Sequence, residues 1–136
     1  MSFLLDTNVV SELRKGPRAN PGVREWASGT TETELYISTL VIGELRQGVE
    51  RLRGRDPVQA EALEAWLDAL KESYAEKIVP VTAEIAERWG RFNVPDKLPA
   101  IDGLLAATAY VRHCTLVTRN TKDVARTGVP TLDPFS

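Results

Sequence analysis

The hydrophobic positions of the chain fall into short apolar runs that are separated by longer stretches with helical periodicity. These runs predict five strands, at Phe3 to Leu5, Leu35 to Ser38, Ile78 to Val81, Leu116 to Thr118 and Thr131 to Leu132. Strands that alternate with helices favour βαβ units, and therefore an α/β fold with a mostly parallel sheet covered on both faces. In such sheets ligands bind outside the carboxyl ends of the strands, where the winding reverses.

Proline and glycine mark the expected ends of the helices. Helix starts are predicted at three pairs, Asn20-Pro21, Asp56-Pro57 and Leu98-Pro99, and breaks at Gly16-Pro17 and Gly54. The helix that follows Asp56 carries one apolar face, formed at three- and four-residue spacing by Leu63, Trp66, Leu67, Leu70 and Tyr74. No repeat or low-complexity segment interrupts the alternation of strands and helices.

Length and composition indicate one globular domain over residues 1–136. A chain of 136 residues can bury roughly two-thirds of its unfolded surface in a single core. Its 43% apolar and 26% charged residues are typical of a globular rather than a disordered protein. No apolar stretch approaches the ~20 residues that span a bilayer, and no basic segment precedes an apolar core at the N-terminus. We therefore expect a cytoplasmic protein with no membrane partner.

The inventory of cysteine and histidine excludes two kinds of site. Cys114 is the only cysteine, so the chain can form no internal disulfide, and we expect a buried thiol. His113 is the only histidine. A zinc site built from cysteine and histidine ligands is therefore excluded, and only oxygen ligands remain for a metal.

The net charge of −2 argues against a protein that holds nucleic acid by bulk electrostatics alone. The distribution of the charges is uneven, since four arginines crowd the segment ELRQGVERLRGR: Arg46, Arg51, Arg53 and Arg55. They can be interpreted either as a solvated helix face or as contacts to RNA phosphates.

Four acidic residues follow the predicted strands. Asp6 comes directly after Phe3 to Leu5, Glu44 lies just past the second strand, Asp102 stands near the start of an alanine-rich helix, and Asp123 follows the fourth strand. Each acid alone could be a helix cap, a solvated helix residue or a turn residue. Together they gather at one edge of the expected sheet, and clustered carboxylates repel unless a cation neutralises them. An all-carboxylate cluster suits Mg²⁺ or Mn²⁺.

The segments that carry these acids resemble the PIN-domain family, and most of all the VapC-type toxin ribonucleases of bacterial toxin–antitoxin pairs. In chain order they read LLDTNVVSEL, TLVIGELRQG, PAIDGLLAATA and LVTRNTKDV, and the resemblance runs from Phe3 to about Pro134. Four separated segments agree in order and spacing. One position departs from the pattern, because Val124 follows the last acid where many relatives have Phe.

The resemblance implies a three-layer α/β/α fold with a mostly parallel sheet of four to five strands. It also implies that Mg²⁺ or Mn²⁺ is bound by four catalytic acids, Asp6, Glu44, Asp102 and Asp123, with support from Asn8, Thr118 and Asn120. The implied function is that of a metal-dependent endoribonuclease, the toxin of a type II toxin–antitoxin system. Its expected partners are an RNA substrate, a VapB-type antitoxin and a second copy of the chain.

Two alternatives remain open from the sequence. The stretch FLLDTNVV superficially resembles the opening motif of aspartyl-nucleophile phosphatases of the haloacid dehalogenase type, in which Asp6 would attack phosphorus. That family requires a second Asp where this chain has Asn8. The other alternative is a non-catalytic, metal-binding PIN-like module that only holds RNA or a protein. Metal-dependent RNA cleavage would separate it from the ribonuclease.

Overall fold

The computed structural model describes residues 1–136, and its centre is a parallel sheet of five strands. The strands are β1 (Phe3–Leu5), β2 (Leu35–Ser38), β3 (Ile78–Val79), β4 (Thr115–Val117) and β5 (Thr131–Leu132). Their spatial order is β3-β2-β1-β4-β5, with every neighbouring pair parallel. From β1 the chain winds outward in one direction through β2 and β3, and β4 and β5 lie on the other side. The winding therefore reverses between β1 and β4.

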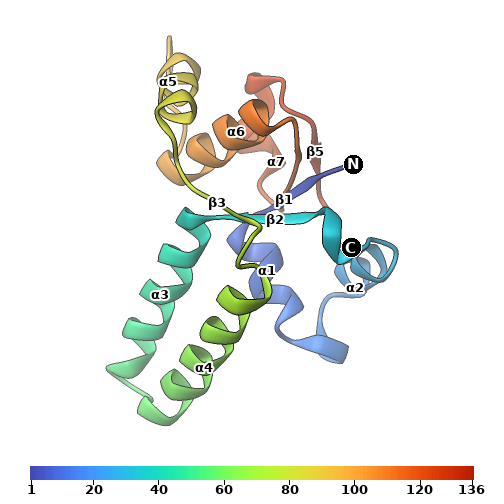
Figure 1. Ribbon diagram of the computed structural model, residues 1–136, viewed down its shortest axis with the longest axis vertical. Coiled ribbons are helices and arrows are strands. Elements are labelled where there is room, and N and C mark those ends of the chain that lie inside the picture. The colour runs from blue at the N-terminus through green and yellow to red at the C-terminus, as the bar shows by residue number, and fades with distance from the viewer.

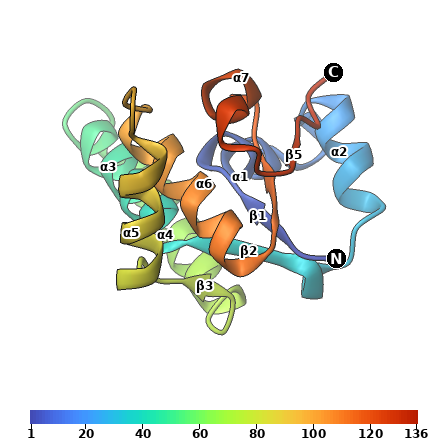
Figure 2. The same ribbon diagram turned by 90° about the horizontal axis from the view of Figure 1, so that it is seen from above.

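Helices cover both faces of the sheet and confirm the predicted three-layer α/β/α fold. In Figure 1 one layer lies below the sheet, with α1 (Thr7–Leu13), α2 (Pro21–Ser28), α3 (Thr39–Arg53) and α4 (Pro57–Ser73). The other layer lies above it, with α5 (Ala83–Phe92), α6 (Ala100–Arg112) and α7 (Thr121–Val124). Figure 2 looks down on this second layer and shows α6 between α5 and α7. None of the helices has both the length and the apolar character needed to cross a membrane.

The core lies where the central strands meet the apolar stripes of the helices. Leu4 and Leu5 of β1 are fully buried, because a central parallel strand is covered on both faces. Val41, Leu45 and Val49 of α3 recur every fourth residue and bury one stripe of that helix against the sheet. Burial of each such side chain stabilises the fold by roughly 1.5–3 kcal/mol. Cys114 is buried as predicted, and this burial raises the pKa of its thiol.

The predicted element boundaries agree with the structure at most positions. The predicted third strand is too long, because Pro80 follows Val79 and has no N–H with which to extend the ladder. The fourth strand begins one residue earlier than predicted, since the Thr115 N–H bonds to the Ser2 carbonyl. Pro99 is the N-cap residue of α6 rather than its first helical residue.

The caps of the helices show why the other starts were predictable. The side chains of Asn20 and Asp56 accept hydrogen bonds from the first turns of α2 and α4, and a proline follows each of them. Gly54 ends α3 as expected. The predicted break at Gly16-Pro17 is a short 3-10 turn, in which Gly16 takes a left-handed φ of 58°.

Candidate active site

Asp6 lies at the carboxyl end of the central strand, at the point where the winding of the sheet reverses. The register pairs Leu5 with Val117, which places Asp6 beside Thr118 at the end of β4. Asp6 is 5% exposed, and its carboxylate accepts three hydrogen bonds. Its Oδ1 accepts the Thr7 N–H at 2.7 Å, and its Oδ2 accepts the Thr118 hydroxyl at 2.7 Å and the Asn8 amide at 3.2 Å. One oxygen therefore caps α1, while the other is held at the switch point.

The three predicted supporting residues, Asn8, Thr118 and Asn120, form one hydrogen-bond network with Asp6. Asn8 and Thr118 contact it directly. The backbone N–H of Asn120 donates to the Thr118 hydroxyl oxygen at 2.9 Å, and the Asn8 side-chain oxygen accepts the Arg119 N–H at 3.3 Å. Two contacts thus connect the loop after β4 to the start of α1: Thr118 with Asp6, and Arg119 with Asn8.

Asp102 lies in the first turn of α6, close enough to Asp6 and Asp123 for their charges to act on its carboxyl group. Burial, followed by the negative charges of Asp6 and Asp123, raises the pKa of Asp102 from its ordinary value of 3.8 to about 6. The Asn120 side chain opposes this rise by hydrogen bonding. Asp123 itself is exposed on the short helix α7. The structure therefore brings three of the four predicted acids into one electrostatic cluster.

Close packing between α5 and α6 fixes the start of the helix that carries Asp102. A Cβ atom on Gly103 would lie 3.2 Å from the Leu98 Cβ and 3.3 Å from the Trp89 Cδ1. A larger residue would therefore push against both neighbours. The Asn93 side-chain oxygen accepts the Leu98 N–H at 2.8 Å and secures the connection between the two helices.

Glu44, the fourth predicted acid, joins the cluster through Thr7. The Thr7 hydroxyl donates to the Glu44 Oε1, while the Thr7 N–H donates to Asp6. One residue thus holds two carboxylates, one by its backbone and one by its side chain. Thr7 was not among the residues predicted from the sequence. The available signal was a hydroxyl residue at the first helical position directly after the acid.

The donor set fits a hard cation, although the acids do not form a complete cage. No three carboxylate, imidazole or thiolate groups of the chain meet closely enough to hold one ion. Mg²⁺ does not require such a cage, because it is commonly bound by one or two carboxylates and keeps several waters. Burial is the largest cause of the raised pKa of Asp102, and the charges of Asp6 and Asp123 add to it; a cation would offset that repulsion.

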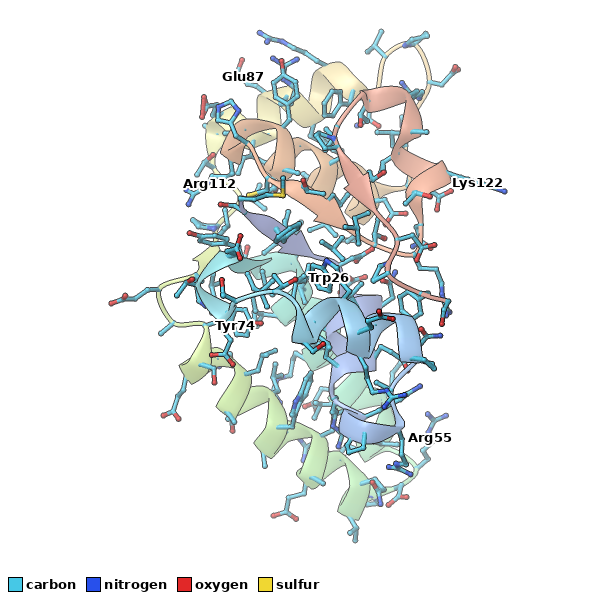
Figure 3. The ribbon with its side chains drawn as sticks, turned by 90° about the vertical axis from the view of Figure 1, so that its right-hand side faces the viewer. Trp26, Arg55, Tyr74, Glu87, Arg112 and Lys122 are labelled. Atoms are coloured by element: carbon cyan, nitrogen blue, oxygen red, sulfur yellow. The ribbon has the colours of Figure 1, made fainter.

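The structure gives two of the four predicted RNA-binding arginines partners within the chain. Arg46 forms ion pairs with Glu64 at 2.6 Å and Glu50 at 3.4 Å, and Arg53 pairs with the same two glutamates at 3.1 and 3.2 Å. Arg51 and Arg55 are exposed and form no ion pair. Arg55 lies at the turn between α3 and α4, in the half of the molecule away from α7 (Figure 3). RNA binding by these arginines stays a prediction.

The raised pKa of Asp102 leads to a prediction about stability. Asp102 keeps its proton up to about pH 6 in the native state but only up to about pH 3.8 in the unfolded state. The free energy of unfolding therefore falls as the pH rises between these two values. Without metal, Asp102→Asn should therefore raise the free energy of unfolding at pH 8. The full shift would be worth about 3 kcal/mol, and solvent screening of this half-buried group reduces the expected gain to about 1 kcal/mol.

Urea unfolding in EDTA measures this gain at pH 8 and at pH 3.5, where it should vanish. Asp68→Asn is the matched control, because Asp68 is an exposed acid on α4. A gain of the same size at both pH values would show that the ionised Asp102 carboxylate is not what destabilises the fold.

Comparisons with known proteins place the chain in a family. The PIN domain family model matches residues 3–129. Toxin FitB of Neisseria gonorrhoeae is 31% identical over 140 residues, which cover 98% of each chain. Ribonuclease VapC14 of Mycobacterium tuberculosis is 38% identical over 68 residues, which cover 50% of this chain and 65% of the relative.

Solved structures agree with the sequence relatives. The crystal structure of FitAcB from Neisseria gonorrhoeae has a TM-score of 0.88, 28% identity and 97% coverage of both chains. A toxin-antitoxin complex from Klebsiella pneumoniae has a TM-score of 0.72, 26% identity and 99% coverage of both chains. With its sheet order, its acidic strand edge and these relatives, the chain belongs to the PIN domain family and is similar to toxins of the VapC type.

Proposed function

We propose that the chain is a metal-dependent endoribonuclease that hydrolyses RNA phosphodiester bonds as the toxin of a type II toxin–antitoxin system. The observation that carries this proposal is the gathering of acids at the carboxyl ends of β1 and β4, where Thr7, Asn8 and Thr118 hold the Asp6 carboxylate. Burial, together with the charges of Asp6 and Asp123, raises the pKa of Asp102 beside it to about 6. Carboxylates crowded at the switch point of a parallel sheet are arranged to receive a cation. The names of the relatives, a toxin and a ribonuclease, support the same activity.

The proposed ligands are Asp6 and Asp102, with Mg²⁺ or Mn²⁺ as the ion. When bound, such an ion supplies a water of lowered pKa and a positive charge beside the scissile phosphate. Three hydrogen bonds fix the orientation of the Asp6 carboxylate. Asp102 must be ionised to bind a cation, so protons compete with the metal and binding should weaken as the pH falls.

Glu44 and Asp123 would complete the proposed site, either in the shell of the same ion or at a second ion. Thr7 orients Glu44, and Asn120 lies between Thr118 and α7, the helix that carries Asp123. No histidine is needed as a general base, because a metal lowers the pKa of its own bound water.

We extend the proposal to the partners of the chain. A VapB-type antitoxin is proposed because a related solved structure is a toxin-antitoxin complex. A homodimer is proposed from the resemblance to VapC-type toxins. Copurification with the product of the neighbouring reading frame, followed by light scattering with and without it, tests both assignments.

Removal of metal tests the proposed activity. Cleavage of a single-stranded RNA should fall at least about a hundredfold in excess EDTA, since a metal contributes several kcal/mol of charge stabilisation in such reactions. Addition of Mg²⁺ or Mn²⁺ beyond the chelator should restore it. Undiminished cleavage in EDTA would overturn the proposal. RNA binding without cleavage under any metal would favour the interaction module instead.

A further inference from the structure

We infer that Arg119 contacts an RNA phosphate beside the acidic site, and this inference rests on the proposed function. The need for such a contact is electrostatic. Asp6, Asp102 and Asp123 present negative charge at the edge where a phosphodiester must bind. A positively charged side chain next to the acids would reduce the repulsion and hold the RNA strand in place.

The backbone of Arg119 belongs to the network that surrounds Asp6. Arg119 stands between Thr118 and Asn120, and its N–H donates to the Asn8 side-chain oxygen at 3.3 Å. Asn8 and Thr118 both donate to the Asp6 carboxylate. The start of the Arg119 side chain is therefore fixed within two hydrogen bonds of the central acid.

The guanidinium group of Arg119 is held by an aromatic ring and has no carboxylate partner. Its central carbon lies 3.9 Å from the centroid of the Phe135 ring, and the residue is exposed. Its charge contributes, after the Asn20 N–H and Lys15, to lowering the pKa of Glu12, which pairs with Lys15. No acidic group lies within ion-pair distance of Arg119, in contrast to Arg46 and Arg53, which each bind two glutamates. A guanidinium that stacks by its face leaves the N–H donors at its edge free for phosphate oxygens.

The Phe135 ring packs against the hydrophobic core, and the backbone on both sides of it is held in place. Asn20 accepts the Ser136 N–H at 3.0 Å and donates to the Ser136 carbonyl at 3.2 Å. A Cβ atom on Gly22 would lie 2.3 Å from the Pro134 carbonyl oxygen, so only glycine permits this approach to α2. Figure 2 shows the last residues of the chain beside α2. The ring is thus a fixed support, and less side-chain entropy is lost when Arg119 binds a ligand.

Other cations near the loop are less suited to this role. Lys122 lies on α7, and its side chain extends away from the ribbon into solvent (Figure 3). Arg126 donates to the Asp96 carbonyl, which occupies part of its guanidinium. Among the basic residues after β4, only Arg119 combines a backbone contact to the Asp6 network with a stacked, unpaired guanidinium.

Salt-dependent RNA binding tests the inference. All proteins carry Asp102→Asn to prevent cleavage, and binding of a fluorescein-labelled oligouridine is followed by anisotropy over a range of NaCl concentrations. Arg119→Gln should weaken binding about tenfold, as expected for loss of a charged hydrogen bond, and reduce the slope of log K against log salt by about 0.7. Arg119→Lys should keep most of the slope but lose affinity, because an ammonium lacks the planar fork.

Arg112→Gln is the matched control, since it removes the same charge from an exposed arginine without an ion pair at the last residue of α6, the end of that helix opposite Asp102. Its slope should equal that of the parent. An unchanged slope in Arg119→Gln, or an equal loss in Arg112→Gln, would overturn the inference, whereas RNA binding by the parent would leave the proposed function in place. A wild-type protein that does not cleave RNA, together with an Asp102→Asn parent that does not bind it, would overturn both. Circular dichroism confirms that each variant is folded.

Discussion

Replacement of Asp102 by Asn is expected to lower RNA cleavage by at least about a hundredfold. The amide has nearly the shape of the carboxylate but carries no negative charge to attract a cation, and several kcal/mol of charge stabilisation depend on that cation in metal-assisted hydrolysis. The fold should be retained, because loss of the charge relieves repulsion from Asp6 and Asp123. Initial rates on single-stranded RNA with Mg²⁺ measure the effect, and calorimetric titration with Mg²⁺ should show weaker binding.

Asp68→Asn serves as the control for this substitution, since it removes one exposed acid from α4 without touching the cluster. It should cleave RNA at the parental rate. If Asp102→Asn retained full activity, the acidic edge of the sheet would have no part in the reaction.

Thr118→Val is expected to lower both stability and activity. The substitution keeps the volume of the side chain but removes the hydroxyl that donates to the buried Asp6 carboxylate at 2.7 Å and accepts the Asn120 N–H at 2.9 Å. A lost hydrogen bond to a charged group, with its partner left buried, costs about 2–3 kcal/mol. Cleavage should fall roughly tenfold or more, because one of the three groups that orient Asp6 is gone. Thr118→Ser should restore both properties.

Thr108→Val is the matched control for this variant. Thr108 is also 1% exposed, but its hydroxyl donates only to the Leu104 carbonyl, one turn earlier in α6. We expect a loss of about 1 kcal/mol or less and no change in cleavage. Urea unfolding in EDTA and initial rates with Mg²⁺ separate the two threonines. Equal losses in both variants would mean that the Thr118 contact to Asp6 has no special importance.

The strands and the positions of the acids could be predicted because each follows from a local pattern. Leu35–Ser38 and Thr131–Leu132 match the predicted strands in full. The rule that ligands bind at the carboxyl ends of parallel strands predicted that Asp6 and Asp102 would meet, although 96 positions separate them. The charges that act on Asp102 agree with that prediction.

The remaining features depend on contacts between segments that no local pattern specifies. Thr7 reaches Glu44 across 37 positions, and the pairing of Arg46 with Glu64 depends on how α3 and α4 pack. The stacking of Arg119 on Phe135 joins β4's loop to the end of the chain. The sequence places Arg46, Arg51, Arg53 and Arg55 in one group because they lie close together along the chain. The structure divides this group, since Arg46 and Arg53 form ion pairs and the other two do not.

The two outer strands also limit how the molecule can associate. β3 and β5 are only two residues long, and each pairs with one neighbour. A short border exposes few unpaired peptide groups, so a further strand from another chain has almost no ladder to extend. Backbone-templated stacking into fibrils is disfavoured for the same reason. A lasting contact with a second protein would therefore rest chiefly on side chains of the helical layers, and single substitutions there would tune its specificity.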